Sequence, residues 1–556
     1  MTDRCLALIC FSPLEQSANI FGFGEFLTSL ALIVIAWTIA DARYRFRIET
    51  AAVPLRFITF WVMVSLAVLT LATDLWQAEG WYVPRGNLFS VNTWEAALGA
   101  VFVATFLTWA WFALLAPPKF GKRNALRFGR CLYRYILKGQ PAELSIVADE
   151  LTRSAKTLIQ LAPQPPRRSR KNSAPPDYSV AETVAWDILS LIADRKFCKA
   201  IVTSSPATAG AIFQEIITSK KFGVPVSSFG HNIVLEALTH PESFMFVESA
   251  RFRAGLIGRI RPLSKAMFGN YELVETQNSF FEHRLYFRNE WSSDQLRAYC
   301  KATLLTFEDY VKRNIWEHSF AIYGVIDTLK SSTSNLYKLD GQPSLDWENS
   351  PYANLRIVVD WIESAVELLN KHETYTSITL RIPEKNGAHL ETIYDYIADL
   401  IAETIFHAAA VREPSWPNWS VQHNALWSEI FCGYKLDNHA GKIIQFKVRR
   451  KLYNEILEME NFPNYRGAAV LSFCLNVLGI SSKFNGMRKS EIALKKAIIS
   501  WVKKNFSSLD NTNSEVAAKS LPNKMKFEGA YSRIISIHPE RGLRTKDHVQ
   551  ILNVSP

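Results

Sequence analysis

Long apolar stretches occupy the first fifth of the 556-residue chain, and shorter amphipathic periods follow them. The long stretches cover residues 21–40, 57–76 and 96–116. A bilayer core about 30 Å thick requires about 20 residues of helix, so each stretch has spanning length. The pattern predicts a three-helix transmembrane domain over residues 21–116. Buried core helices of a soluble protein are the alternative, although such helices are usually shorter.

Basic residues are unevenly distributed around these stretches and predict their orientation. One side holds Arg43, Arg45, Arg47 and Arg56, together with seven basic residues between 119 and 138; the other side holds only Arg4 and Arg85. Cytoplasmic loops carry the excess of Lys and Arg. We therefore expect a multi-pass protein of the cell membrane, with an extracytoplasmic leader over residues 1–20 and residues 117–556 in the cytoplasm.

A basic segment over residues 117–161 follows the third stretch. Five of its cations are spaced by four, three, four and four residues, which places them along one helical face: Arg123, Arg127, Arg130, Arg134 and Lys138. The spacing predicts an amphipathic helix that contacts a bilayer with anionic headgroups. A solvated basic face that only enforces topology is the alternative. Pro141 then predicts a helix that continues to about Leu161.

The remaining chain is predicted to be mainly α-helical with minor β structure. A Pro-, Arg- and Ser-rich linker covers residues 162–178, helical periods cover 179–506 with a sub-boundary near 331–350, and a polar tail covers 507–556. The tail is expected to be irregular up to about Phe527, with a short strand at 534–537.

Local signals place three helices in this region. Ser292 and Gln295 resemble a capping box before a long helix that reaches toward Leu329. Pro351 predicts the start of a second helix, and a third is expected over 390–411. The apolar face of the second helix is formed by Leu355, Val358, Ile362, Val366 and Leu369. Alternating apolar residues predict strands at 378–382 and 444–448.

The charge of the chain is local rather than general. With 63 Lys and Arg against 52 Asp and Glu, the net charge is +11. The segments 119–138 and 167–171 account for this excess, so no general nucleic-acid surface is expected. The composition, 48% hydrophobic with seven Cys, excludes a fully disordered, collagen-like or disulfide-stapled chain.

Common catalytic motifs are absent from the sequence. It contains no G-x-x-x-x-G-K-[ST], G-x-S-x-G, H-E-x-x-H or C-x-x-C. No cofactor is therefore predicted, and the scattered cysteines are most simply explained as buried thiols.

One short motif is specific enough to suggest an enzyme. The residues Arg313-Asn314-Ile315-Trp316-Glu317-His318 are similar to the R-N-x-x-x-H signature of HEPN-type ribonucleases. The resemblance implies that two such motifs meet across a dimer of helical domains, with Arg313 and His318 acting on the RNA 2′-hydroxyl and phosphate and Asn314 orienting them. The motif is expected in mid-helix, where residues five apart point about 140° away from each other. A polar helix face is the alternative.

Five titratable residues repeat every fourth position: Glu391, Asp395, Asp399, Glu403 and His407. Three of them, Asp399, Glu403 and His407, are candidates for a divalent metal or a proton relay. A hydrated acidic ridge or docking surface is favoured, because a row of this spacing winds around a helix by about 40° at each step. No metal site is therefore predicted.

Three carboxylates lie near the outer ends of the predicted spans: Glu25, Asp74 and Glu95. Carboxylates at this depth are costly unless they face water or a partner. In an oligomer they would form an acidic ring that favours cations at a pore mouth. Alternatively, each simply marks a helix end at the interface.

A large cytoplasmic part on a small membrane part suggests sensing inside the cell and an outcome at the membrane. We expect a non-enzymatic membrane effector or receptor that forms homo-oligomers and binds a cytoplasmic protein or small molecule. In one form of this hypothesis the oligomer is a cation-permeable channel. A membrane-tethered HEPN-like ribonuclease and a non-catalytic membrane scaffold are the alternatives.

Overall fold

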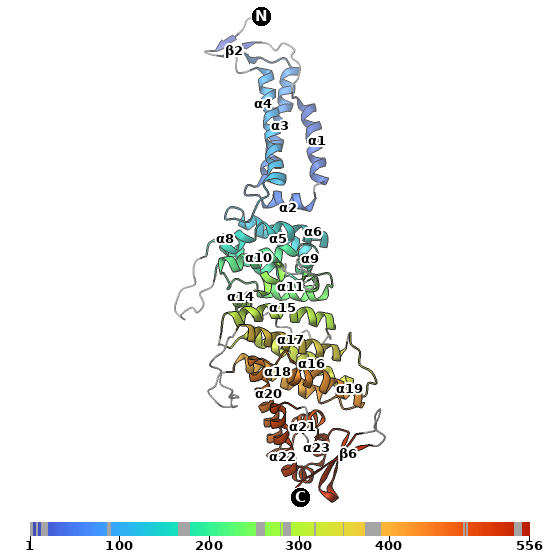
Figure 1. Cartoon of the computed structure of the whole chain (residues 1–556). Helices are drawn as coiled ribbons and strands as arrows, with labels where there is room; N and C mark the ends of the chain where they lie inside the picture. The colour runs from blue at the N-terminus through green and yellow to red at the C-terminus, as the bar shows by residue number, and fades with distance from the viewer. Residues whose placement is uncertain are drawn as a thin grey trace. The chain divides into compact units, whose positions relative to one another are not determined.

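The computed structural model describes most of the chain as helix (Figure 1). The described residues are 4–6, 9–12, 21–39, 41–85, 90–164, 178–251, 262–278, 280–281, 291–315, 318–348, 350–372, 391–481, 484, 487–538 and 547–555. The chain divides into two compact units, Met1–Glu236 and Ala237–Pro556, and the boundary falls within helix α11 (Ser227–Thr239). The prediction of a mainly helical chain is confirmed.

The first unit begins with the apolar helices. They are α1 (Phe23–Ile39), α3 (Leu55–Ala78) and α4 (Val91–Ala110), and α4 continues into a π-helical segment, η1 (Trp111–Leu115). The short helix α2 (Ala42–Thr50) connects α1 to α3. By length and composition, Leu55–Ala78 and Val91–Leu115 are each able to cross a membrane, whereas α1 is a shorter apolar helix. Three short antiparallel strands accompany these helices: β1 (Arg4–Leu6), β2 (Ile9–Ser12) and β3 (Val83–Arg85).

A small aromatic core holds α1, α3 and α4 together. Phe26 of α1 is fully buried against Met63 and Leu66 of α3 and against Leu98 and Phe102 of α4. The rings of Phe26 and Phe102 meet edge to face, with centroids 6.1 Å apart. Edge-to-face aromatic pairs add about 0.5–1.5 kcal/mol beyond their buried area. This core fixes one face of each helix and leaves the opposite faces exposed.

Seven further helices are present among the described residues of the first unit. They are α5 (Ala125–Lys138), α6 (Pro141–Thr152), α7 (Ala155–Leu161), α8 (Val180–Leu191), α9 (Arg195–Ser204), α10 (Pro206–Ser219) and α11. The helix predicted from Pro141 to Leu161 is interrupted at Arg153–Ser154, so it forms two helices. Both α5 and α7 pack against α8, so the predicted linker connects elements of one unit; its residues 165–177 lie outside the described residues.

The described elements of the second unit are helices as far as Lys519. Its helices are α12 (Phe244–Arg251), α13 (Pro262–Phe268), α14 (Tyr271–Gln277), α15 (Ser293–Lys312), α16 (Phe320–Thr333), η3 (Ser334–Leu339), α17 (Pro351–Lys371), α18 (Ile393–Ala408), α19 (Ser415–Trp419), η4 (Ser420–Cys432), α20 (His439–Glu458), α21 (Tyr465–Leu478), α22 (Lys489–Thr512) and α23 (Ser514–Lys519). An antiparallel sheet follows, with β4 (Met525–Glu528), the short η5 (Gly529–Tyr531), β5 (Arg533–His538) and β6 (His548–Asn553) in the order β4-β5-β6.

Several local predictions are confirmed in this unit. Ser292 and Gln295 form the capping box of α15, and Ser350 caps α17 immediately before Pro351. All five residues of the predicted apolar face of α17 are buried. The strand predicted at 534–537 is β5.

Other predictions in this unit differ from the structure. The strand predicted at 444–448 is wrong, because these residues lie inside α20, where Ile444, Val448, Leu452 and Ile456 form a buried stripe with a four-residue period. The helix expected to reach Leu329 ends at Lys312 instead. The segment expected to be irregular from residue 507 to about Phe527 contains the end of α22, α23 and most of β4, and an unpredicted strand, β6, follows β5. The strand predicted at 378–382 lies outside the described residues.

Candidate functional site

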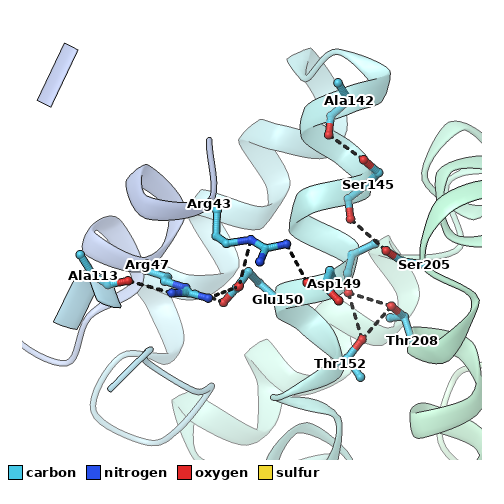
Figure 2. A network of polar contacts seen from close by, with 11 residues as sticks. Arg43, Arg47, Ala113, Ala142, Ser145, Asp149, Glu150, Thr152, Ser205 and Thr208 are labelled. Atoms are coloured by element: carbon cyan, nitrogen blue, oxygen red, sulfur yellow. Dashed lines mark hydrogen bonds and ion pairs between the residues drawn. The ribbon is translucent and has the colours of Figure 1, made fainter. Parts of the chain in front are cut away.

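A buried ion pair ties the apolar helices to the helices that follow them. Arg47 of α2 donates from Nε to Glu150 Oε2 at 2.9 Å and from Nη2 to Glu150 Oε1 at 2.6 Å, which is bidentate geometry (Figure 2). Its Nη1 donates to the carbonyl oxygen of Ala113 at 2.8 Å. Arg47 is 5% exposed and Glu150 is 4% exposed. One guanidinium therefore joins α2, the π-helical end of α4, and α6.

The electrostatics of this pair favour the charged form of Arg47. The hydrogen bond to Glu150 raises the pKa of the Arg47 guanidinium, although burial acts in the opposite direction. Bidentate Arg–carboxylate pairs are among the stronger hydrogen-bonded pairs in proteins. Removing one partner of a buried pair costs about 3–5 kcal/mol, since the other charge is left uncompensated.

A second, more exposed ion pair lies beside the first. Arg43, one helical turn before Arg47, donates from Nη2 to Asp149 Oδ2 at 2.9 Å, and its Nε lies 3.6 Å from Glu150 Oε1. Two consecutive acids of α6 thus face two arginines of α2 at i and i+4 (Figure 2). Because both side chains of the Arg43–Asp149 pair are more than a third exposed, this contact contributes less than the buried pair.

Hydroxyl groups extend the polar network from α6 to α10. The buried Thr208 donates to the carbonyl oxygen of Ala148 at 2.8 Å, and its Oγ1 lies 2.8 Å from Oγ1 of Thr152. Ser205 donates to the carbonyl oxygen of Ser145 at 3.2 Å (Figure 2). The network therefore continues from the apolar helices through α6 into the next helical layer.

The segment between α4 and α5 is also fixed by buried polar contacts. Asn124 donates through Nδ2 to the carbonyl oxygen of Thr50 at 2.6 Å and to that of Lys119 at 3.0 Å. The backbone N–H of Phe120 donates to Ser154 Oγ at 3.0 Å. These bonds connect the end of α2 with the segments that flank α5 and α7.

The predicted basic helix exists as α5 (Ala125–Lys138), and one of its faces is apolar and buried. Its apolar residues Phe128, Leu132 and Ile136 are buried. Of the five cations, Arg123, Arg130, Arg134 and Lys138 are exposed and Arg127 is half-buried. Arg127 donates to the carbonyl oxygen of Ala52 and Arg134 to Glu49, so α5 is docked on α2 through its basic face as well.

The structure brings Glu25, Asp74 and Glu95 together at the start of α1. Their oxygens accept from three consecutive backbone N–H groups: Glu95 from Phe21 at 3.4 Å, Glu25 from Gly22 at 3.0 Å, and Asp74 from Phe23 at 2.8 Å. Carboxylates at a helix N-terminus satisfy unpaired donors and interact favourably with the helix dipole. Within one chain, the three residues thus act as caps of α1.

The two ends of the R-N-x-x-x-H motif have separate partners. The helix ends just before the motif, because Asn314 adopts the left-handed conformation at φ 52°. Arg313 pairs with Asp309 at 2.8 Å and with Glu272 at 3.5 Å. His318 Nδ1 contacts the hydroxyl group of Tyr396. Across the described residues, Arg313 and His318 make no hydrogen bond or ring contact with each other.

Four residues of the predicted row lie on α18, and Glu391 lies two residues before it. The three acids on α18 pair with basic side chains. Asp395 binds Lys447 at 2.6 Å in a buried pair, and Asp399 binds Lys451 at 2.5 Å. Glu403 binds Arg466 at 2.7 Å and lies 3.6 Å from His407 Nε2. Burial lowers the pKa of His407. In the part of the chain that the structure describes, no three His, Cys, Asp or Glu residues form a group suited to a metal ion.

The comparisons with known proteins give no relative: no family model, no curated protein and no solved structure matches the chain. Sequence reasoning missed the Arg47–Glu150 pair, although it used Arg47 to orient the membrane helices. The two residues are 103 positions apart, so no local spacing connects them.

Proposed function

We propose that the chain is an integral membrane effector or receptor, in which α1, α3 and α4 span the bilayer and the later helices lie in the cytoplasm. In this proposal the N-terminus is outside, and a cytoplasmic binding event acts on the membrane helices through α2 and α6. The anionic leaflet contacts α5, and a cytoplasmic protein or small molecule supplies the signal.

The observation that supports membrane insertion is the exposure of the apolar helices. Only 28% of the most apolar window of α3 and 17% of that of α4 is buried. Core helices of soluble proteins bury such residues, and large exposed apolar patches mark membrane or protein interfaces. Exposed side chains on these helices include Phe57, Phe60, Leu71, Val103 and Leu107.

The buried Arg47 network supports coupling rather than simple anchoring. A tether requires no polar contacts between a membrane helix end and a distant helix. Here one guanidinium joins α2, the end of α4 and α6, and hydroxyl groups connect α6 to α10. A displacement of α6 is therefore expected to reach both α2 and α4.

The cation-channel and ribonuclease hypotheses have less support from the described residues. The carboxylates of the proposed cation ring, Glu25, Asp74 and Glu95, already accept hydrogen bonds within one chain. The ribonuclease version requires Arg313 and His318 to act together, but each is bound to other side chains.

Cysteine labelling tests the membrane topology. In a cysteine-free background, Glu79→Cys and Ser555→Cys place single thiols after α3 and at the end of the chain. We expect a membrane-impermeant maleimide to label Glu79→Cys in intact cells, and Ser555→Cys only after permeabilisation. Equal labelling of both in intact cells, or recovery of the protein in the soluble fraction, would contradict the proposal.

A further inference from the structure

A cavity of about 940 Å³ lies between α1, α3, the end of α2 and α5. Ligand pockets in proteins usually enclose about 300–1,000 Å³. All the residues that line it belong to the first unit. One part of its lining is apolar and the other part is basic.

The apolar part of the cavity is formed by the apolar helices α1 and α3. Leu30, Ile33 and Val34 come from α1, and Phe60 and Trp61 come from α3. In the proposed topology, the three α1 residues lie toward the cytoplasmic end of that helix. The two α3 residues lie near the start of α3, which is also on the cytoplasmic side. An acyl chain is the ligand group that matches such walls at this depth.

The basic part of the cavity is formed by arginines. Three of them come from successive turns of α5, namely Arg127, Arg130 and Arg134, and Arg56 comes from the start of α3. Arg134 is paired with Glu49, the one acidic residue of the lining. In the described part of the chain, Arg130 makes no hydrogen bond or ion pair. Guanidinium groups bind phosphate oxygens in a bidentate manner.

We propose that this cavity binds an anionic phospholipid of the cytoplasmic leaflet, with its phosphate on Arg127 and Arg130 and an acyl chain between α1 and α3. Basic pockets between membrane helices on the cytoplasmic side are suited to anionic headgroups. The inference rests on the proposed insertion of α1 and α3 in the bilayer. It goes beyond general attraction of α5 to the surface, because it assigns one bound lipid to defined residues.

Arg130 has a defined role in this site. Its neighbours along the basic face are held by Glu49 and by the carbonyl oxygen of Ala52, whereas its own guanidinium is available for a ligand. A free phosphate would use the arginines and leave the apolar walls without a partner. A neutral lipid would use the walls and leave a net positive charge uncompensated. Only an anionic amphiphile satisfies both parts.

The test is lipid binding by the intact chain in uncharged detergent micelles. Phosphatidylglycerol or phosphatidylcholine is added, and the bound lipid is counted by native mass spectrometry. We expect one phosphatidylglycerol to bind and phosphatidylcholine to bind much more weakly. Arg127→Gln combined with Arg130→Gln should weaken phosphatidylglycerol binding about 30-fold, since each basic residue contributes about a fivefold factor near an anionic headgroup.

The matched control is Arg123→Gln combined with Lys138→Gln. Lys138 is in α5 and Arg123 lies just before it, and both side chains are exposed and do not line the cavity. The control substitutions remove the same charge as the test substitutions. The control should retain phosphatidylglycerol binding. An equal loss in both double variants would overturn the proposal and leave only a general surface attraction.

Two further arms separate the lipid from a soluble anion. Val34→Trp fills the apolar part and should abolish lipid binding while the arginines remain. A large excess of inorganic phosphate should displace little lipid, and complete displacement would overturn the assignment to a lipid. Failure of these arms with correct cysteine labelling would reject the lipid site alone, whereas failure of the labelling would reject the membrane topology.

Discussion

Replacing Arg47 with glutamine is the sharpest perturbation of the junction between the apolar helices and α6. Arg47 is 5% exposed and Glu150 is 4% exposed. The change removes the positive charge of Arg47 and leaves the carboxylate of Glu150 without its bidentate partner. It also leaves the carbonyl oxygen of Ala113 without this donor. Glutamine is shorter and cannot replace all three bonds.

The expected magnitude follows from the burial of both charges. Breaking a buried ion pair from one side costs about 3–5 kcal/mol. For a unit of this size, each kcal/mol lowers Tm by about 2–4 °C, so Arg47→Gln should lower Tm by about 6–20 °C. Arg45→Gln is the matched control, because Arg45 lies on the same helix but is exposed, and it should change the free energy of unfolding by about 0.5 kcal/mol or less.

The assay is thermal unfolding of the intact chain in detergent, followed by tryptophan fluorescence. A double variant, Arg47→Met with Glu150→Leu, should recover most of the loss, since apolar residues of similar volume often replace a buried pair without net cost. The reasoning is refuted if Arg47→Gln and Arg45→Gln unfold at the same temperature. It is also refuted if the double variant is as unstable as Arg47→Gln.

Three other outcomes are expected in the second unit, each measured by thermal unfolding of the intact chain. Gly441→Ala should destabilise α20 strongly, because its Cβ would lie 2.1 Å from the carbonyl oxygen of Leu436. Gly324→Ala, in the interior of α16 with open space around it, should instead stabilise by about 0.5–1 kcal/mol. Burial lowers the pKa of Lys524 to about 8, so its charged form opposes folding fully below that pH and progressively less from pH 8 to 10. Lys524→Met should therefore raise Tm at pH 7, and this advantage should shrink as the pH rises to 10; an advantage that does not change with pH would contradict the effect.

Local signals predicted the structure where neighbouring residues determine it. The capping box at Ser292 and Gln295 satisfies unpaired donors of its own helix, so it requires no tertiary information. The apolar period after Pro351 is long enough to specify a buried face. In contrast, the alternation at 444–448 is too short to distinguish a strand from a helix, and packing of α20 against α18 and α21 decided the outcome.

The contacts that form the candidate sites depend on tertiary structure, so the spacing of residues in the sequence does not predict them. Asn314 ends α15 because asparagine tolerates the left-handed conformation, and that signal was present in the sequence but weaker than the surrounding helical pattern. The sequence predicted that Glu25, Asp74 and Glu95 share a level near the helix ends, whereas their contacts with the start of α1 depend on the packing of three helices. No sequence pattern predicted that Glu150 of α6 pairs with Arg47, which lies on α2.

The position of Arg47 and Glu150 in the chain has a consequence for biogenesis and for dissecting the protein. Glu150 is synthesised 103 residues after Arg47, so α2 and the apolar helices are made before their buried counter-charge exists. A fragment that stops after α4 leaves the Arg47 guanidinium uncompensated, and one that begins after α4 leaves the Glu150 carboxylate in the same state. Truncation at the end of the apolar helices would therefore divide one compact unit and separate the two halves of its buried ion pair.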